Sequence, residues 1–255
     1  MSELFSIQLQ NRQQQGRDGV WLDLPTTTEQ VQAALRQIGI SSDNPQGLFI
    51  SGYFAEEEKR FAIPYNMVLA SNVDELNFLA ARLETLSAGE RAELNAALQA
   101  PQSELSSIGK ITDFPENVEY YVHLPDVRGP AQLGDYYLNR SGMVDIPEEW
   151  KGGIDTAQFG RYVAQQEQGA FTQYGHLVKS GDAWQKVHEG RPVPEEYRVL
   201  SFPVPEVMRD AANIPPPVQP ETEPQKVIPI ILNGKDSAER MKEITDRLET
   251  GIQQL

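Results

Sequence analysis

Residues 19–40 read GVWLDLPTTTEQVQAALRQIGI, a stretch in which the spacing of apolar side chains changes half-way. Residues 19–24, GVWLDL, are a strand candidate. Further along, apolar side chains recur at helical spacing, at Val31, Leu35 and Ile38. Thr26 and Glu29 match a capping box at the helix start, and Gly39 suits the position after its end. The stretch therefore predicts a strand followed by a helix.

Two further strands are predicted on either side of this stretch. FSIQLQ at 5–10 alternates apolar and polar residues, and GLFISGYF at 47–54 is a third strand candidate. One helix on a small sheet is the simplest arrangement of these elements. Residues 1–66 are therefore expected to form an N-terminal α+β module.

Residues 67–100 are expected to form a helical module. Two capping boxes, Asn72 with Glu75 and Ser87 with Glu90, mark the starts of two helices. An apolar stripe follows the first start, at Leu76, Leu79, Leu83 and Leu86. A shorter stripe follows the second start, at Leu94, Ala97 and Leu98. Two short helices joined by about one turn predict an antiparallel helical hairpin that packs on a neighbour.

Residues 101–203 are expected to form a C-terminal α+β module. Its predicted elements are strands at 118–124 and 197–202, helices at 130–142 and 154–166, and a hairpin at 175–190. The hairpin would turn at Ser180, Gly181 and Asp182. Asp155 would lie near the N-terminus of the second helix, where the helix dipole favours an acid. The chain is therefore predicted to be an α+β protein built from three small modules.

The composition changes after residue 203. Residues 204–234 are rich in proline and predict an extended, semi-rigid linker. Residues 235–255 predict an amphipathic helix with an apolar face at Met241, Ile244, Leu248 and Leu255. This face is still running where the sequence stops, so the helix is expected either to dock elsewhere or to begin a further domain.

Acidic side chains outnumber basic ones throughout the 255 residues. The chain has 37 Asp and Glu against 22 Lys and Arg, which gives a formal net charge of −15. The excess is present in residues 1–100, 101–203 and 204–255 alike. Such a surface repels nucleic acid and attracts proteins that bind negative charge, so direct DNA binding by the main body is not expected. The alternative interpretation is that the charge serves solubility alone.

The sequence lacks the usual marks of a membrane or secreted protein. It has no cysteine, no apolar run of membrane-spanning length and no signal-peptide pattern at its start. These features predict a cytoplasmic protein without disulfides, thiolate catalysis or a membrane contact.

Motifs with reactive side chains are also missing. No phosphate-binding glycine loop or nucleophile elbow occurs, and His123, His176 and His188 lack metal-ligand spacing. His176 and His188 flank the predicted hairpin and could meet across it, but a third ligand is not evident. An enzyme, a metal site and a cofactor are therefore not expected. A carboxylate hydrolase stays open as a hypothesis, because the many acids could form a pair.

Three stretches resemble the ArdA antirestriction proteins of conjugative elements and phages. They are WLDLPTTTEQVQAALRQIGI (21–40), DELNFLAARLETLSAGERAELNAAL (74–98) and LGDYYLNRSGMVDIPEEWKGGIDTAQFGRYVAQQEQGAFTQYG (133–175). The last of these resembles the Leu-Gly-x-Tyr-Tyr and Phe-Gly-Arg region of the family. The order and spacing of the stretches match over residues 4–203, and three in order are fairly specific.

The resemblance implies an elongated rod of three small modules that forms a homodimer through the third. It also implies a protein of a mobile genetic element, such as a conjugative transposon, that inhibits Type I restriction-modification enzymes. The inhibition would be DNA mimicry, in which surface carboxylates stand in for phosphates and occupy the DNA-binding groove. The acids expected in this role are Glu56, Glu57, Glu58, Asp74, Glu75, Glu84, Glu90, Glu93, Asp135, Asp145, Glu148, Glu149 and Asp155.

The resemblance also points to an antirestriction motif that would make the dimer contact. Its residues here are Ile154, Phe159, Gly160 and Arg161. The family has tyrosines at two positions that are Gly153 and Thr156 in this chain, and an acid where this chain has Tyr162. The loss of two aromatic side chains and one acid bears on dimer packing and on inhibitory strength.

The net charge sets a limit on the mimicry. A dimer would carry about −30, which is the charge of roughly 15 base pairs of duplex DNA. A longer mimic must therefore gather its acids on one face. The alternative function is an acidic adaptor that binds a basic protein of the mobile element or its host, without a restriction target.

The C-terminal stretch SAERMKEITDRLETGIQQL (237–255) carries a second resemblance. It is similar to the opening helix of the single-stranded-DNA-binding domain of ArdC-type antirestriction proteins. This likeness implies that the helix is the start of a second, truncated domain.

Overall fold

The computed structural model describes residues 3–14, 18–41, 45–57, 60–101 and 103–200. These residues form two compact units. The first unit contains Glu3–Val118 and Gln185–Leu200, and the second contains Glu119–Trp184. The predicted linker at 204–234 and the predicted helix at 235–255 lie outside the described residues.

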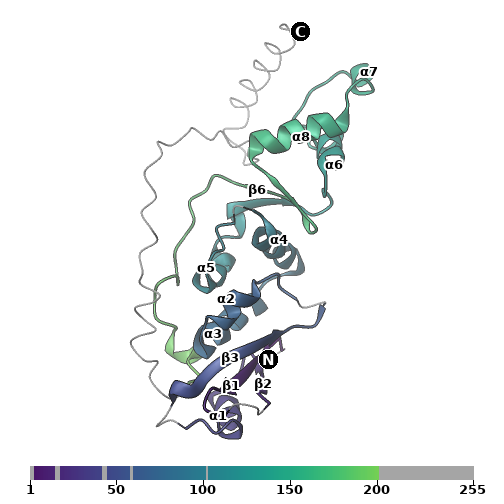
Figure 1. Ribbon diagram of the computed structural model, residues 1–255. Coiled ribbons are helices and arrows are strands. Elements are labelled where there is room, and N and C mark those ends of the chain that lie inside the picture. The colour runs from purple at the N-terminus through teal and green to yellow at the C-terminus, as the bar shows by residue number, and fades with distance from the viewer. Residues whose placement is uncertain (1–2, 15–17, 42–44, 58–59, 102, 201–255) are drawn as a thin grey trace, which may run out of the picture. The chain divides into compact units, whose positions relative to one another are not determined.

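The first unit begins with a three-stranded antiparallel sheet in the order β2-β1-β3. Its strands are β1 (Phe5–Asn11), β2 (Val20–Leu24) and β3 (Leu48–Phe54), as predicted. Helix α1 (Thr28–Gln37) lies beside the sheet in Figure 1 and contacts β2. Its apolar face is buried, at Val31, Ala34 and Leu35. The prediction of one helix on a small sheet is therefore confirmed.

The first helix begins one residue later than its capping pattern predicts. Thr27 caps α1, and its side chain accepts a hydrogen bond from the backbone N–H of Gln30 at 3.4 Å. Thr26 is buried, and its N–H donates to Asn77 Oδ1 at 2.7 Å, so a long-range contact takes it away from the cap. Gly39 follows the helix with a φ of +69°, as expected.

Helices follow the sheet in the first unit. They are α2 (Tyr65–Leu69), α3 (Val73–Glu84), α4 (Ala88–Gln99) and α5 (Ile108–Thr112). Both predicted capping boxes are present, Asn72 with Glu75 and Ser87 with Glu90. The predicted apolar stripe of α3 is buried, and α3 packs against α5. Short 3₁₀ helices also occur along the chain, namely η1 (Pro45–Gly47), η3 (Phe114–Glu116), η4 (Val118–Tyr120) and η6 (Glu195–Tyr197).

Residues 185–200, which we call the returning segment, rejoin the first unit without forming a strand. The N–H of Gln185 donates to Asn117 Oδ1 at 2.7 Å, and Asn117 Nδ2 donates back to the Gln185 carbonyl at 3.0 Å. These bonds take up backbone groups that a strand partner would need. Residues 185–190 therefore do not form the second strand of the predicted 175–190 hairpin, and this part of the prediction is wrong.

The end of the returning segment is held by α3. Asp74 Oδ1 accepts hydrogen bonds from the backbone N–H groups of Val199 and Leu200 at 2.8 and 2.9 Å. Asn77 Nδ2 donates to the carbonyl of Tyr197 at 3.0 Å. Residues 197–200 therefore do not form the predicted strand, because side chains of α3 bind their backbone.

The second unit contains another antiparallel sheet, in the order β4-β6-β5. Its strands are β4 (Tyr121–Leu124), β5 (Ala170–Thr172) and β6 (Gly175–Lys179). The hairpin of this region therefore joins β5 to β6. The helices are α6 (Pro130–Asp135), its π-helical continuation η5 (Tyr136–Arg140), α7 (Glu148–Lys151) and α8 (Thr156–Glu167). The helices predicted at 130–142 and 154–166 are confirmed.

The observed elements make this an α+β protein, as predicted. The module boundaries predicted after residues 66 and 100 both fall inside the first unit, so that subdivision stays a prediction. In the part of the chain that the structure describes, every helix is too short or too polar to cross a bilayer.

Candidate functional site

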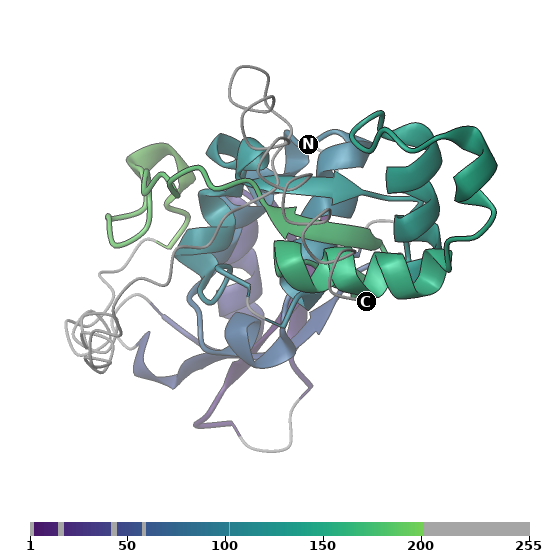
Figure 2. The same ribbon diagram turned by 90° about the horizontal axis from the view of Figure 1, so that it is seen from above.

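Two glycines allow helices α6 and α8 of the second unit to pack backbone against backbone, as can be followed in Figure 1 and Figure 2. A Cβ atom at Gly160 on α8 would overlap the carbonyl oxygen of Pro130 on α6. A Cβ atom at Gly134 on α6 would overlap the carbonyl oxygen of Thr156 on α8. Gly160, which sequence reasoning placed at a dimer contact, thus already packs within its own chain.

The other residues of the predicted motif divide between interior and surface. Phe159 is half-buried and packs on a cluster formed by Val127, Leu133, Tyr137, Val163 and Ala164. Ile154 is half-buried, whereas Arg161 is exposed. Arg161 is therefore the member of the motif that is most available to a partner.

Residues 145–155 form an exposed acidic segment around α7. Its acids are all exposed, namely Asp145, Glu148, Glu149 and Asp155. The one base in this stretch is Lys151, whose Nζ lies 2.8 Å from Glu148 Oε2. Asp155 also caps α8, because its Oδ1 accepts two backbone N–H bonds of 2.9 Å from the first turn. The acidic segment therefore presents four carboxylates to solvent against one ammonium group.

Three further candidate acids are engaged at helix starts. Asp74 is only 7% exposed, and its carboxylate holds the returning segment. Glu75 accepts from the N–H of Asn72 at 3.3 Å, and burial raises the pKa of Glu75. Glu90 accepts from the N–H of Ser87 at 2.7 Å, and hydrogen bonds to Ser87 lower the pKa of Glu90. Asp74 is therefore too buried to contact another protein.

Glu93 on α4 is partly buried. Burial, with a smaller contribution from the Glu90 carboxylate, raises the pKa of Glu93 to about 8. Glu93 Oε1 is buried and lacks a hydrogen-bond partner among the described residues. Near neutral pH this carboxyl is mainly protonated, so it is a poor substitute for a phosphate. Glu84, at the end of α3, is half-buried.

The remaining candidate acids differ in exposure. Glu56 and Glu57 follow β3 and are exposed, whereas Glu58 lies outside the described residues. Asp135 Oδ2 lies 3.2 Å from Arg140 Nη2 at the surface of the second unit. The predicted acids are therefore not equivalent, and those of the acidic segment form the largest exposed group among them.

Several basic side chains are held against their own chain. The guanidinium carbon of Arg12 lies 5.2 Å from the ring centroid of Phe49, and that of Arg91 lies 5.7 Å from the ring of Phe61. Others pair with acids, namely Arg82 with Glu116, Lys110 with Glu104, and Lys186 with Glu189. These contacts direct cationic groups toward neighbours within the chain, while the acids of residues 145–155 face solvent.

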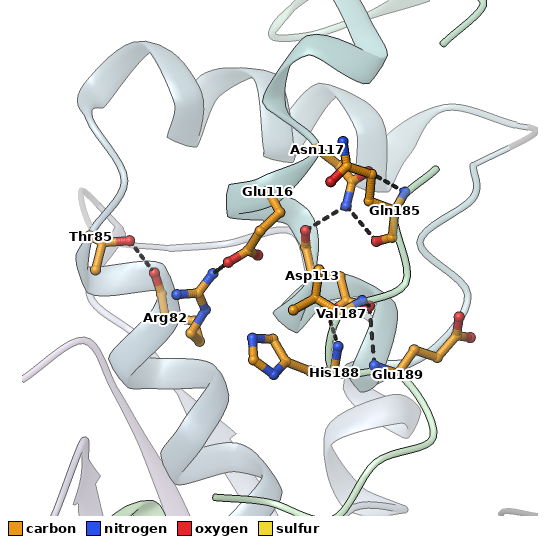
Figure 3. A network of polar contacts seen from close by, with 9 residues as sticks. All are labelled: Arg82, Thr85, Asp113, Glu116, Asn117, Gln185, Val187, His188 and Glu189. Atoms are coloured by element: carbon orange, nitrogen blue, oxygen red, sulfur yellow. Dashed lines mark hydrogen bonds and ion pairs between the residues drawn. The ribbon is translucent and has the colours of Figure 1, made fainter. Parts of the chain in front are cut away.

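One group in the described residues has ligand atoms close enough to hold a metal ion: Asp113, Glu116 and His188, within 4.8 Å of one another (Figure 3). Asp113 is fully buried, and its carboxylate accepts backbone N–H bonds of 2.6–3.2 Å from residues 187–189. Glu116 forms an ion pair with Arg82, whose charge would repel a cation. The group therefore fastens the returning segment and is poorly suited to a metal.

The second unit encloses a polar network of three residues. The hydroxyl of Tyr137 donates to Glu167 Oε1, and His176 Nε2 lies 3.4 Å from Glu167 Oε2. Glu167 and His176 are buried, and burial together with the nearby Glu167 carboxylate raises the pKa of Tyr137. The network joins η5, α8 and β6. Because it is closed to solvent, it offers no carboxylate to a substrate.

The protein-family model described as "Antirestriction protein (ArdA)" matches residues 15–178, well over half of the chain. The chain belongs to the ArdA antirestriction protein family. The match includes the α6–α8 pair and the whole acidic segment, and it confirms the family resemblance of the sequence. A search among curated proteins gives no match.

Sequence reasoning missed one surface feature of this ArdA-family chain. Trp21 and Phe54 are both exposed and lie against each other, with ring centroids 6.5 Å apart. A partial signal was present, because Trp21 and Asp23 are two residues apart in the strand candidate 19–24, which places the ring on the same face as an acid.

Proposed function

We propose that this ArdA-family chain is a DNA mimic that keeps Type I restriction-modification enzymes from binding DNA. The proposal rests on the acidic segment 145–155, which lies within the family match and exposes four carboxylates against one lysine. Proteins that bind DNA neutralise phosphates with Lys and Arg. A surface with the same sign of charge competes with DNA for those groups.

The proposed mode of action requires neither catalysis nor a cofactor. Binding alone excludes DNA if the acids of the mimic occupy the same basic groups. A hydrolase would need a pair of carboxylates that a substrate can reach. The buried carboxylate of Glu167 is closed to solvent, so the many acids favour binding over hydrolysis. A protein with such a target would act in the cytoplasm and would benefit a mobile element that enters a restricting cell.

We further propose that the active form is a homodimer whose contact involves the second unit. Arg161 and Tyr162 are exposed on α8, and Trp150 on α7 is 67% exposed. Phe159 and Gly160 support this surface from inside through the apolar cluster and α6. Sedimentation of the purified chain measures its mass directly, and a monomer at micromolar concentration would contradict this part of the proposal.

The deciding experiment is competition for the methyltransferase core of a Type I enzyme. Added at micromolar concentration, the chain should release a fluorescent DNA duplex from that core. The double variant Glu148→Gln/Glu149→Gln should require roughly fivefold more protein, because it removes two exposed charges. The control Glu195→Gln/Glu196→Gln removes the same charge from an exposed pair outside the family match and should have little effect.

The outcomes separate the proposed function from its alternative. Failure of the unaltered chain to release DNA would show that this enzyme class is not the target. Equal losses in the two double variants would show that net charge, and not the acidic segment, carries the effect. Capture of a basic protein of the element or host, without any release of DNA, would favour the acidic adaptor.

A further inference from the structure

The open face of the first sheet places two aromatic rings beside an acid. Trp21 and Asp23 point to the same side of β2, and both are exposed. The strand register sets Ser6 of β1 between Asp23 on one side and Phe54 of β3 on the other. These side chains therefore share one face, which is opposite to the buried face of the sheet.

Gly52 lets the indole of Trp21 extend across the sheet. Gln8 of β1 pairs with Trp21 on one side and with Gly52 on the other. A Cβ atom at Gly52 would lie 3.0 Å from Trp21 Cη2, so the far edge of the indole reaches β3. Glycine inside a strand costs stability, and here it provides room for this close approach. Ser51 Oγ donates a hydrogen bond of 3.0 Å to Gln8 Oε1. This bond holds the Gln8 side chain between Trp21 and Gly52.

Phe54 completes the aromatic surface. Its ring meets the indole of Trp21 edge to face, with an angle of 75° between the planes. Trp21 is 49% exposed and Phe54 is 58% exposed. Two large aromatic side chains that are ordered against each other and still open to water are typical of a contact surface.

Asp23 gives this surface a negative charge. Its Oδ1 accepts a hydrogen bond of 2.6 Å from Ser6 Oγ, which orients the carboxylate two residues along the strand from Trp21. An aromatic face with a carboxylate beside it suits a guanidinium group, which stacks on the ring and donates to the oxygen atoms.

The same sheet face already contains an example of this chemistry. Phe49 pairs with Gln10, which lies on the same side of β1 as Gln8. The guanidinium of Arg12 stacks over the Phe49 ring. At Phe49 the chain supplies its own arginine, whereas Trp21 leaves about half of its surface open to water.

We propose that Trp21, Phe54 and Asp23 form a binding site for an arginine side chain on the basic surface of the protein partner. This rests on the proposed function, since a groove that binds DNA presents arginines, and the net charge of −15 complements such a groove. Arginine fits better than lysine, because its planar group stacks and donates at the same time. The site adds a short-range contact to the long-range attraction between the acids and the partner.

The first test probes the site without any restriction enzyme. The full chain is titrated with a hexa-arginine peptide and, separately, with a hexa-lysine peptide of equal charge, while NMR follows the tryptophan indole N–H signals. Trp21→Phe assigns the Trp21 signal. That signal should shift with hexa-arginine at a concentration roughly fivefold lower than with hexa-lysine. Asp23→Asn should reduce the difference.

Trp184 provides the internal control for this titration. Its indole packs edge to face on Tyr120, with ring centroids 5.1 Å apart, and its Nε1 is buried, so its signal should shift little with either peptide. A Trp21 signal that stays unmoved, or that responds equally to both peptides, would overturn the arginine site.

The second test uses the methyltransferase core. Trp21→Gln should weaken binding about tenfold, mainly through faster dissociation, whereas Trp21→Phe keeps an aromatic face and should recover most of the affinity. If the unaltered chain releases DNA and Trp21→Gln does so equally well, the arginine site is wrong. If the unaltered chain does not release DNA, the proposed function fails, and the peptide titration still decides the site.

Discussion

Glu93 differs from Glu90, the other acid of α4, because the fold keeps much of its carboxyl group away from water. Its pKa is about 8 in the native state, against an ordinary value of 4.5. Between these two pH values the native chain holds a proton that the unfolded chain has lost. The free energy of unfolding therefore falls as the pH rises through this window.

Replacing this carboxyl group with a neutral amide should remove the loss of stability that the charged form causes at high pH. We expect Glu93→Gln to raise the free energy of unfolding at pH 8 by at least about 1 kcal/mol. One pKa unit corresponds to about 1.4 kcal/mol, and the partial exposure of the group reduces the effect of the full shift. At pH 4.5 the gain should be small. Urea unfolding followed by circular dichroism at both pH values measures it. The control Glu57→Gln alters an exposed acid and should change little, and a gain from Glu93→Gln that is equal at both pH values would contradict the assignment.

The positions of the candidate acids could be predicted from the sequence, but their environments could not. Asp74 and Glu75 stand next to each other at a helix start, where both were expected as exposed charges. Asp74 is buried because residues 199 and 200, over a hundred positions away, use it as a hydrogen-bond acceptor. Such a contact leaves no local pattern, so burial and pKa were beyond sequence reasoning.

At the level of elements, local signals predicted most helices and strands correctly. The errors have the same long-range origin. Thr26 leaves the cap of α1 because Asn77 binds its backbone, and Thr27 takes its place. The turn at Ser180 was a sound local signal, since Ser180 Oγ donates to Asp182 Oδ2 at 2.9 Å and Gly181 has a φ of +90°. The chain after this turn binds Asn117 and Asp113 through its backbone, which prevents a second strand.

The contact between α6 and α8 depends on glycine in a way that can be tested. Gly160→Ala would set a methyl group against the carbonyl oxygen of Pro130, so the helices must separate. We expect a loss of about 2 kcal/mol or more in the free energy of unfolding, as for other overpacked sites. The matched control is Gly152→Ala, because no atom lies within 4 Å of a Cβ at Gly152 and its φ of −63° suits alanine.

Urea unfolding of the two glycine variants gives the comparison. If Gly160→Ala is as stable as Gly152→Ala, the close packing of α6 on α8 does not hold the second unit together. If Gly160→Ala folds but no longer dimerises, its effect passes through the position of α8 to the exposed Arg161. This would explain how a glycine buried inside the chain belongs to a contact motif.

At the scale of the whole molecule, the charge of −15 acts before any contact forms. Electrostatic attraction reaches about 30 Å at 0.01 M salt and about 8 Å at 0.15 M salt. A partner with a basic groove is therefore drawn in from a distance only when the salt concentration is low. Attraction of this kind raises the association rate more than it slows dissociation.

The rates of binding to the methyltransferase core should separate charge from contact. Stopped-flow measurements without DNA avoid the salt dependence of DNA binding itself. Raising the salt from about 0.05 M to 0.3 M should slow association at least about tenfold, with little change in dissociation. Glu148→Gln/Glu149→Gln should reduce this salt dependence, whereas Trp21→Gln should leave it unchanged and speed dissociation at every salt concentration. An association rate that does not respond to salt would mean that apolar contact, and not the acidic surface, drives binding.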